Sequence, residues 1–352
     1  MDSTQPGASG LNAEDQAELL ARSSSNWWNS KTMKRFLRNP LAIVGALLLI
    51  FFVFIALFAA PLTSNQLINT RNTCVRELGL SASTVTDIRN PLKLVFWRAV
   101  VLPPSECFSI PRVSFSPIPT PASEGTFLGT TGGGYDIYYG LVWGARSAFY
   151  VGVAVTGFSV LIGIIVGSIS GFFGGWIDNI LMRLVDIIFA IPSLVLAIVI
   201  VSILGQSLQN VVIALMIFGW ASYARLLRGD VMGLKEREFV DGARALGAGN
   251  NRLIFRHILP NAIGPLLIIA SLDIGSVVLA VAALSFLGLG APVGYADWGQ
   301  MINFARGWLQ GPPGQPFAYW YVSFWPGLII VLFVLSWNLL GDAVRDVLDV
   351  RG

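Results

Sequence analysis

Long runs of apolar residues limit what this chain can fold into more than any other feature of its sequence. They lie near residues 40–61, 147–173, 184–204, 208–227, 260–290 and 322–341. A helix of roughly 20 apolar residues crosses a hydrocarbon layer about 30 Å thick. With 54% hydrophobic and 12% charged residues among 352, the chain carries more apolar side chains than one soluble core buries. We therefore expect an all-α polytopic membrane protein with about six transmembrane helices.

Basic residues beside these runs predict how the chain crosses the membrane, because cytoplasmic loops carry an excess of lysine and arginine. One cluster precedes the first run and another lies between the fourth and fifth; the members are Lys31, Lys34, Arg35, Arg38, Arg225, Arg228, Lys235, Arg237, Arg244, Arg252 and Arg256. Four runs separate the two clusters, so both face the cytoplasm if every run crosses. The N- and C-termini are then cytoplasmic as well.

This orientation divides the chain into five parts. They are a polar cytoplasmic tail with the basic juxtamembrane cluster at 1–39, a first transmembrane helix at 40–61, an extracytoplasmic loop at 62–145, a core with five transmembrane helices at 146–345, and a cytoplasmic C-terminus at 346–352. Within the core, the residues at 228–259 form the expected cytoplasmic loop.

Both cysteines of the chain, Cys74 and Cys107, fall in the expected extracytoplasmic loop. Disulfides persist in oxidising compartments outside the cytoplasm, so we expect these two residues to form one. A bond closing about 30 residues stabilises a chain by roughly 3–4 kcal/mol through loop entropy. The alternative is two unpaired, small apolar side chains.

Glycines recur at a spacing of four in the second run; the members are Gly163, Gly167, Gly171 and Gly175. Residues four apart share one face of a helix, and small residues on that face let helices approach closely in lipid. We expect a packing ridge, whose partner is another helix of this chain or a second subunit. A glycine-rich helix without a specific partner is the alternative.

Two residues inside the apolar runs are candidates for a translocation pathway. Asp273 is an ionisable residue within the fifth run, where burial of a charge demands a partner or a function. It either has a role in a substrate cavity or a helix contact, or it is a structural carboxylate with a local partner. Pro192 is expected to kink the third helix by removing a backbone hydrogen bond, and a kinked helix either lines a cavity or simply packs.

The sequence does not predict an enzyme. It has no G-x-x-x-x-G-K-[ST] loop for nucleotide phosphates, and the glycines at 132–134 are better interpreted as a linker. His257 is the only histidine and lies far from both cysteines, so no zinc ligand set is present. We also find no serine elbow that would pair with His257 in a hydrolase. No cofactor, no metal and no nucleic acid is expected for this chain.

The charged segment between the fourth and fifth runs reads EFVDGARALGAGNNRLIFRHILP from Glu238 to Pro260. Charged residues alternate with small and apolar ones, which is typical of a short amphipathic helix. It resembles the coupling loop of ATP-binding-cassette importer permeases, E-A-A-x-x-x-G followed about ten residues later by an apolar residue and x-L-P. The corresponding residues are Glu238 at the start, Asp241, Gly242 and Ala243 in the E-A-A positions, Gly247, His257 at the apolar position, Leu259 and Pro260. We expect Gly247 to end the short helix as its C-cap and Pro260 to open the fifth span in its first helical turn.

Other motifs resemble the dipeptide and oligopeptide branch of these permeases over nearly the whole chain. They are FLRNPLAIVGALLL, GFFGGWIDNILMRLVDIIFAIPSL, ALSFLGLG, DWGQM, WPG and NLLGDAVRDVLDVR. Before the second run, the family pattern G-T-D-x-x-G-R-D…G-A-R is retained at Gly129, Thr130, Gly134, Asp136, Gly144, Ala145 and Arg146. Thr131 and Tyr135 replace its Asp and Arg, so a role for that charge pair does not transfer.

The resemblance implies a type I ABC importer permease fold in the plasma (inner) membrane of a prokaryote. It implies a second homologous permease, two ATP-binding subunits or domains that hold ATP and magnesium, and an extracytoplasmic substrate-binding protein. Peptides are the leading substrate class, and nickel chelates, oligosaccharides and peptide-like antibiotics are the alternatives. Two other classes stay open: a secondary transporter, for which Asp273 is the only support, and a channel or scaffold, which would not bind an ATPase.

Overall fold

The computed structural model describes residues 39–63 and 105–348. These residues form helices and connecting loops, with isolated β-bridges but no strand among them. Most of the expected N-terminal tail, much of the expected extracytoplasmic loop with Cys74, and the last four residues lie outside the described residues. The helices are α3 (Pro40–Leu57), α4 (Ala59–Leu62), η3 (Ser105–Phe108), α8 (Ile137–Phe173), α9 (Gly175–Phe189), α10 (Ser193–Leu204), α11 (Leu208–Lys235), α12 (Glu238–Ala245), α13 (Asn250–Arg252), the π-helical turn η4 (Leu253–Ile258), α14 (Leu259–Phe286), α15 (Trp298–Ala305), η5 (Arg306–Trp308) and α16 (Trp320–Leu348).

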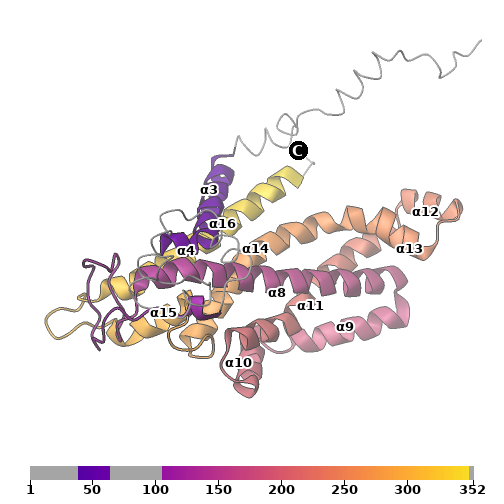
Figure 1. Ribbon diagram of the computed structural model, residues 1–352. Coiled ribbons are helices and arrows are strands. Elements are labelled where there is room, and N and C mark those ends of the chain that lie inside the picture. The colour runs from indigo at the N-terminus through magenta and orange to yellow at the C-terminus, as the bar shows by residue number, and fades with distance from the viewer. Residues whose placement is uncertain (1–38, 64–104, 349–352) are drawn as a thin grey trace, which may run out of the picture.

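Five helical stretches in the described residues are long and apolar enough to cross a membrane, and α9 with α10 makes a sixth if that bent pair is one span. The five are α3, α8, α11, the continuous path from α13 through α14, and α16. In Figure 1, α8 runs along the length of the molecule, with α12 and α13 at one end and α15 at the other. The all-α polytopic fold expected from the sequence is therefore confirmed.

The third span differs from the single kinked helix predicted over 184–204. Helix α9 begins at Gly175 and ends at Phe189, and α10 starts afresh at Ser193, bent by 82° from α9. Pro192 provides the reason, because it has no amide hydrogen for a helical bond and restricts the residue before it. Pro192 itself has an extended ψ of 128° and is the N-cap of α10. The proline breaks the helix rather than kinking it.

Helix α8 packs against α11 along the predicted glycine ridge. A Cβ built on Gly163 would lie 2.4 Å from the Cβ of Tyr223, and one on Gly167 would lie 2.7 Å from the carbonyl oxygen of Ala224. Gly171 faces the carbonyl oxygen of Arg228 at 2.8 Å in the same way. Only glycine permits this backbone approach. The partner helix thus belongs to this chain.

Gly175 is not part of that ridge, and its prediction was wrong. Helix α8 ends at Phe173, and Gly174 and Gly175 adopt φ values of 63° and 60°, a left-handed region that favours glycine. The chain turns there into α9, and a Cβ on Gly175 would meet no atom within 4 Å. The spacing of four persists in the sequence, but the helix it requires has already ended.

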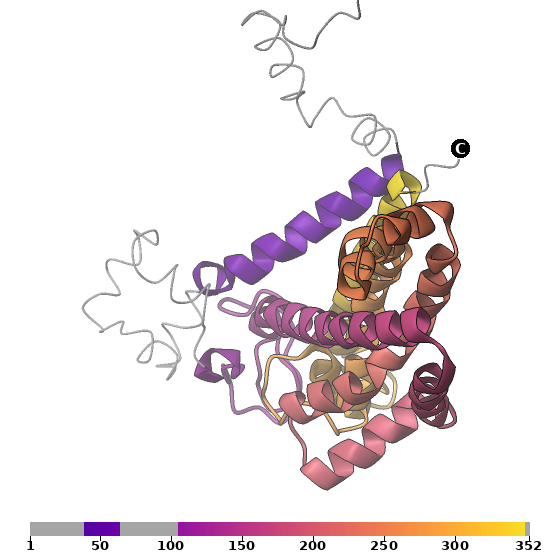
Figure 2. The ribbon, with the colours of Figure 1, turned by 90° about the vertical axis from the view of Figure 1, so that its right-hand side faces the viewer.

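Helix α3 lies at the edge of the molecule (Figure 2) and packs against α16. Its start is fixed by Asn39, whose side-chain oxygen accepts from the amide of Leu41 at 3.0 Å and whose Nδ2 donates to Asp346 Oδ2 of α16 at 3.0 Å. A Cβ on Gly45 would lie 2.6 Å from the Cβ of Leu339. The outer surface of α3 carries exposed leucine, isoleucine and phenylalanine side chains, as lipid-facing helices do.

The end of the molecule that carries η3, α4, α15 and the start of α8 is densely packed, and we call it the capped end. Trp143 is fully buried there, stacks on Tyr139 with ring centroids 5.9 Å apart, and donates from Nε1 to Thr63 Oγ1 at 3.0 Å. Phe108 meets the same indole edge-on at 5.5 Å. Aromatic pairs of this geometry contribute beyond their buried area.

The retained family residues at the capped end have structural roles. Asp136 is the N-cap of α8 and accepts from the amide of Tyr139 at 2.9 Å, so α8 begins at Ile137 rather than near 147 as predicted. Arg146 donates to the carbonyl oxygens of Ala56 and Leu57. These carbonyls end α3 and have no partner within that helix. The motif therefore joins the first and second spans.

The replaced charge pair has a different partner in this chain. Arg112 Nη2 donates to the Tyr135 hydroxyl at 2.5 Å, and its guanidinium lies 4.7 Å from the centre of the Tyr135 ring. The ring of Phe304 of α15 also stacks on the Tyr135 ring, with the two ring centroids 5.3 Å apart. A cation–π and stacking contact thus stands where the family has a pair of charges.

Cys107 is fully buried and disulfide-bonded, and since Cys74 lies outside the described residues, their pairing stays a prediction.

Candidate coupling segment and membrane cavity

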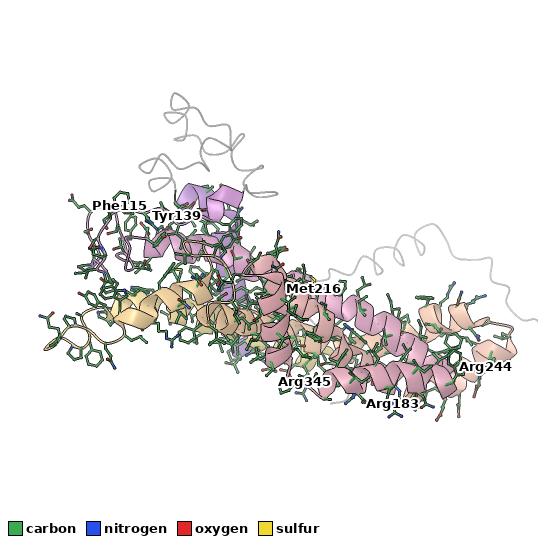
Figure 3. The ribbon with its side chains drawn as sticks, turned by 90° about the horizontal axis from the view of Figure 1, so that it is seen from below. Phe115, Tyr139, Arg183, Met216, Arg244 and Arg345 are labelled. Carbon is green, nitrogen blue, oxygen red and sulfur yellow. The ribbon has the colours of Figure 1, made fainter. Side chains whose placement is uncertain are left out.

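The segment from Glu238 to Pro260, which we call the coupling segment, lies at the end of the molecule opposite the capped end. Figure 3 shows Arg244 of α12 at one extreme and Phe115 at the other. In α12, Val240 is the one buried residue, while Glu238 and Asp241 lie exposed in the first turn. Acidic residues there favour the positive end of the helix dipole. Arg244 Nη1 pairs with Asp241 Oδ1 at 2.8 Å.

Gly247 ends α12 in the manner that its position predicts. Its φ is 84°, its amide donates to the carbonyl of Arg244 at 3.0 Å, and the amide of Ala248 donates to Ala243 at 3.1 Å. This pair of bonds is the Schellman motif, which satisfies carbonyls that the helix leaves open. The side of Gly247 where a Cβ would project is empty. Its requirement for glycine is therefore conformational and not steric.

The second half of the coupling segment is a π-helical turn over Leu253–Ile258 that runs directly into α14. Pro260 lies in the first turn of α14, as predicted, but the π-helical turn comes directly before it, so the helical path is continuous from Asn250. A proline inside a helix removes one amide donor and clashes with the carbonyl four residues earlier; a wider π turn is one way to accommodate both. Asn261 Nδ2 donates to the carbonyl of His257 at 2.6 Å. His257 contributes its backbone to this turn.

The coupling segment has one attached face and one open face. Val240, Leu253 and Ile258 are buried in a cluster with residues of α11 and α14, and Ala243 and Leu259 pack against it. In contrast, Leu246 is 91% exposed and Phe255 is 68% exposed. Gly242 has no atom near the position of a Cβ. The segment is thus fixed to the membrane helices from one side and presents large apolar side chains on the other.

A cavity of about 420 Å³ lies between α8, α10, α11 and α14 and includes the break before α10. Both residues that the sequence suggested for a pathway line it, Asp273 from α14 and Pro192 from the break. Asp273 Oδ2 accepts from the hydroxyl of Tyr223 on α11 at 2.7 Å. The sequence left two roles open for Asp273, a pathway residue or a locally paired structural carboxylate. In the structure it has a protein partner and also lines a cavity.

The structure also contains a charged contact that the sequence analysis missed. Asp178 of α9 pairs with Arg228 of α11, with Nε and Nη2 at 2.5 and 2.6 Å from the two carboxylate oxygens, and Ser170 donates to the same carboxylate. Such a two-pronged geometry is strong for arginine. Asp178 and Arg228 are fifty residues apart in the sequence, so no local pattern indicated that they would pair. On the exposed surface, Arg225 pairs with Asp186 at 2.5 Å.

Groups of metal-ligating side chains do not occur among the described residues. Nothing in that part of the chain provides a set of ligands for a metal ion. The predicted site residues lie instead in two places, the coupling segment and the cavity beside Asp273.

Residues 160–351 match the family of binding-protein-dependent transport system inner membrane components, and residues 26–73 match the N-terminal transmembrane domain of oligopeptide transport permease C. The chain belongs to this family of multi-pass inner-membrane permeases. The resemblance to the dipeptide and oligopeptide branch is thereby confirmed. Membership implies, in general terms, a binding protein and an ATPase as partners.

Three relatives illustrate the match. The chain is 38% identical over 322 residues to the dipeptide transport system permease protein DppC of Alkalihalophilus pseudofirmus, covering 91% of this chain and 89% of the relative. It is 34% identical over 340 residues to the oligopeptide permease OppC of Bacillus subtilis, covering 97% and 94%. It is 36% identical over 262 residues to the glutathione permease GsiD of Pectobacterium atrosepticum, covering 74% and 83%. Among solved structures, it is similar to the inward-facing MetNI methionine ABC transporter, with 21% identity, a TM-score of 0.46, and coverage of 59% of this chain and 96% of that chain.

Proposed function

We propose that this chain forms half of the translocation pathway of an ATP-driven importer for di- and oligopeptides, which an extracytoplasmic binding protein delivers. The observation that carries this proposal is the 38% identity to a dipeptide permease over 91% of the chain. The oligopeptide relative, matched over 97% of the chain, supports the same substrate class. The chain itself binds no cofactor in this scheme; ATP and magnesium belong to its partners.

The partners in this scheme are a second homologous permease, two ATP-binding subunits or domains, and the binding protein. The coupling segment faces the cytoplasm, as do both termini. Support for this orientation comes from the arginines at the α12 end, Arg237, Arg244 and Arg252, since cytoplasmic loops are rich in basic residues. The capped end then faces the binding protein.

The coupling segment is the surface that contacts an ATPase subunit. The coupling segment exposes two large apolar side chains, Leu246 and Phe255, and the carboxylates of Glu238 and Asp241. Protein interfaces combine apolar and charged side chains in the same way. The buried Val240, Leu253 and Ile258 connect the coupling segment to α11 and α14. A force applied to the exposed face therefore reaches two membrane helices directly.

Charge reversal at the coupling segment tests this assignment. The double variant Glu238→Lys and Asp241→Lys should abolish ATP-dependent uptake of trialanine by the reconstituted importer and prevent co-purification of the ATPase subunits. Glu124→Lys, an exposed carboxylate at the capped end, is the matched control and should retain the ATPase. Normal uptake and ATP hydrolysis with the double variant would show that the segment does not couple.

The source of energy separates this function from a secondary transporter. Uptake into proteoliposomes should require ATP and continue after a proton gradient is collapsed, since Asp273 is the only carboxylate that lines the cavity. Peptide transport by this chain alone, driven by an ion gradient, would overturn the proposal.

A further inference from the structure

The cavity between α8, α10, α11 and α14 has an unequal distribution of charge. Among its lining residues, Asp273 is the one carboxylate, and there is no lysine, arginine or histidine. The nearby Arg225 of α11 pairs with Asp186 and lies over the ring of Phe189. Neither Arg225 nor Asp186 lines the cavity, so the charge of Arg225 is balanced outside it. A cavity with one acid in apolar walls favours a cation over an anion.

Two buried hydroxyl groups line the same cavity. Thr156 and Ser159 lie three residues apart on α8 and therefore share one face of that helix. Their side chains are 5% and 1% exposed, and neither hydroxyl has a hydrogen-bond partner in the described structure. A buried hydroxyl without a hydrogen-bond partner costs free energy. These two oxygens therefore indicate a ligand that donates hydrogen bonds to them.

An ammonium group fits this set of acceptors. It carries a positive charge and three N–H donors, and the wall offers the Asp273 carboxylate and the oxygens of Thr156 and Ser159. Phe218 also lines the cavity, and aromatic faces attract cations. The Tyr223 hydroxyl already donates to Asp273 Oδ2 at 2.7 Å, which keeps the carboxylate in place.

The volume limits how much of a ligand enters. About 420 Å³ is within the range of small-molecule pockets, which begins near 300 Å³, and is too small for a long peptide. We propose that this cavity is a subsite for the amino-terminal ammonium group of a peptide in transit, with Asp273 as its counter-ion. This inference rests on the proposed import of peptides and adds the group by which the permease itself recognises them.

Thiol labelling measures the charge of the cavity without any transport. Ser276 lines the cavity one turn after Asp273 and is exposed, so Ser276→Cys supplies a reporter in the assembled importer. A cationic methanethiosulfonate reagent should react about tenfold faster than an anionic one. Asp273→Asn should bring this ratio close to one, whereas Asp342→Asn, an exposed carboxylate of α16 outside the cavity, should leave it unchanged. The protein without Ser276→Cys gives the background from the native cysteines.

Protection of the same reporter tests the ligand. Trialanine, which has a free ammonium group, should slow labelling at least threefold at millimolar concentration, and N-acetyl-trialanine should not. Combined Thr156→Val and Ser159→Ala substitutions should reduce protection while leaving the charge ratio intact, and they serve as the test if Asp273→Asn does not assemble. Equal protection by both peptides would overturn the inference. A ratio near one between the cationic and anionic reagents, in the protein with Ser276→Cys as its only substitution, would overturn it as well.

The result is separable from the peptide proposal itself. If the loaded importer fails to take up trialanine with ATP, the proposed function fails. If it takes up trialanine while both peptides protect equally, the function stands and the ammonium subsite is wrong.

Discussion

The capped end and the coupling segment solve opposite problems with the same kind of helix. At the capped end, Trp143 and Tyr139 are fully buried, and Asp136 and Arg146 close the ends of two helices. At the coupling segment, α12 buries Val240 alone and leaves Leu246 almost completely exposed. One region obtains its stability from contacts within this chain. The other leaves its largest side chains free for a partner.

The difference teaches that stability and coupling are carried by separate parts of the molecule. Contacts that lie within one chain contribute to its folding, whereas exposed apolar side chains contribute only when another protein covers them. Substitutions at the two ends should therefore affect different measurements. The four predictions below test that division, from the largest expected change in stability to the smallest.

Trp143→Ala should destabilise the protein most, by about 3–5 kcal/mol, as removal of a buried aromatic side chain does. It deletes the stack on Tyr139 and leaves Thr63 Oγ1 without its indole donor. Thermal unfolding of the detergent-purified protein measures the effect. Trp176→Ala, at a largely exposed indole, is the control. A loss below 1 kcal/mol at Trp143 would mean that the capped end is not the stabilising region.

Gly167→Ala should cost about 1–3 kcal/mol, because the added methyl would lie 2.7 Å from the Ala224 carbonyl oxygen and force α8 away from α11. Gly157→Ala in the same helix is the matched control, since no atom lies within 4 Å of its Cβ position. That control should be neutral or stabilising by up to about 1 kcal/mol, because alanine favours a helix. Equal shifts in Tm for the two variants would remove the role of the ridge.

Asp297 gives a pH-dependent test at the capped end. It is the N-cap of α15 and accepts from the amide of Gln300 at 2.9 Å. Burial raises the pKa of its carboxyl above the ordinary value. The folded protein therefore holds the proton more tightly than the unfolded chain, and stability falls as the pH rises from about 4 through the raised pKa.

Two substitutions separate the charge of Asp297 from its capping bond. Asp297→Asn keeps a good cap and should flatten that pH dependence, while Asp297→Ala should lose about 1 kcal/mol. Unfolding measured across this pH range checks both expectations. A steeper curve for Asp297→Asn would contradict the assignment.

Leu246→Ser should leave stability within about 0.5 kcal/mol of the original protein, as exposed positions usually do, yet reduce ATP-dependent uptake strongly. This variant is the sharpest test of the division, because it changes only the exposed face of the coupling segment. Val331→Ser, another exposed apolar residue on α16, is the control for general surface effects. Loss of stability without loss of uptake would reverse the comparison between the two ends.

The sequence predicted those parts of the fold that depend on local pattern. The apolar runs located the spans because a membrane requires about 20 residues of one character. The spacing of Gly163, Gly167 and Gly171 predicted a packing face, and Gly247 predicted the end of α12. Each of these depends on residues close together in the chain.

The errors arose where geometry interrupts a pattern or joins distant residues. The spacing to Gly175 continued, although the helix had ended at Phe173. The effect of Pro192 was a full break and not a kink: α9 ends at Phe189, and Pro192, with an extended ψ of 128°, is the N-cap of α10. The pair between Asp178 and Arg228 depends on how α9 folds back beside α11, which no local pattern indicates. The cavity beside Asp273 likewise appears only when four helices are assembled.

Helix α8 has a mechanical consequence that follows from its length. At 37 residues and 1.5 Å per residue it extends about 55 Å, longer than the roughly 40–45 Å of a complete bilayer. One uninterrupted rod therefore has its first turn among the aromatic residues of the capped end and its last turn beside the Ser170 and Asp178 contact. Because the glycine ridge holds α11 closely against α8, a tilt of this rod at one end of the molecule would displace α11 along with it.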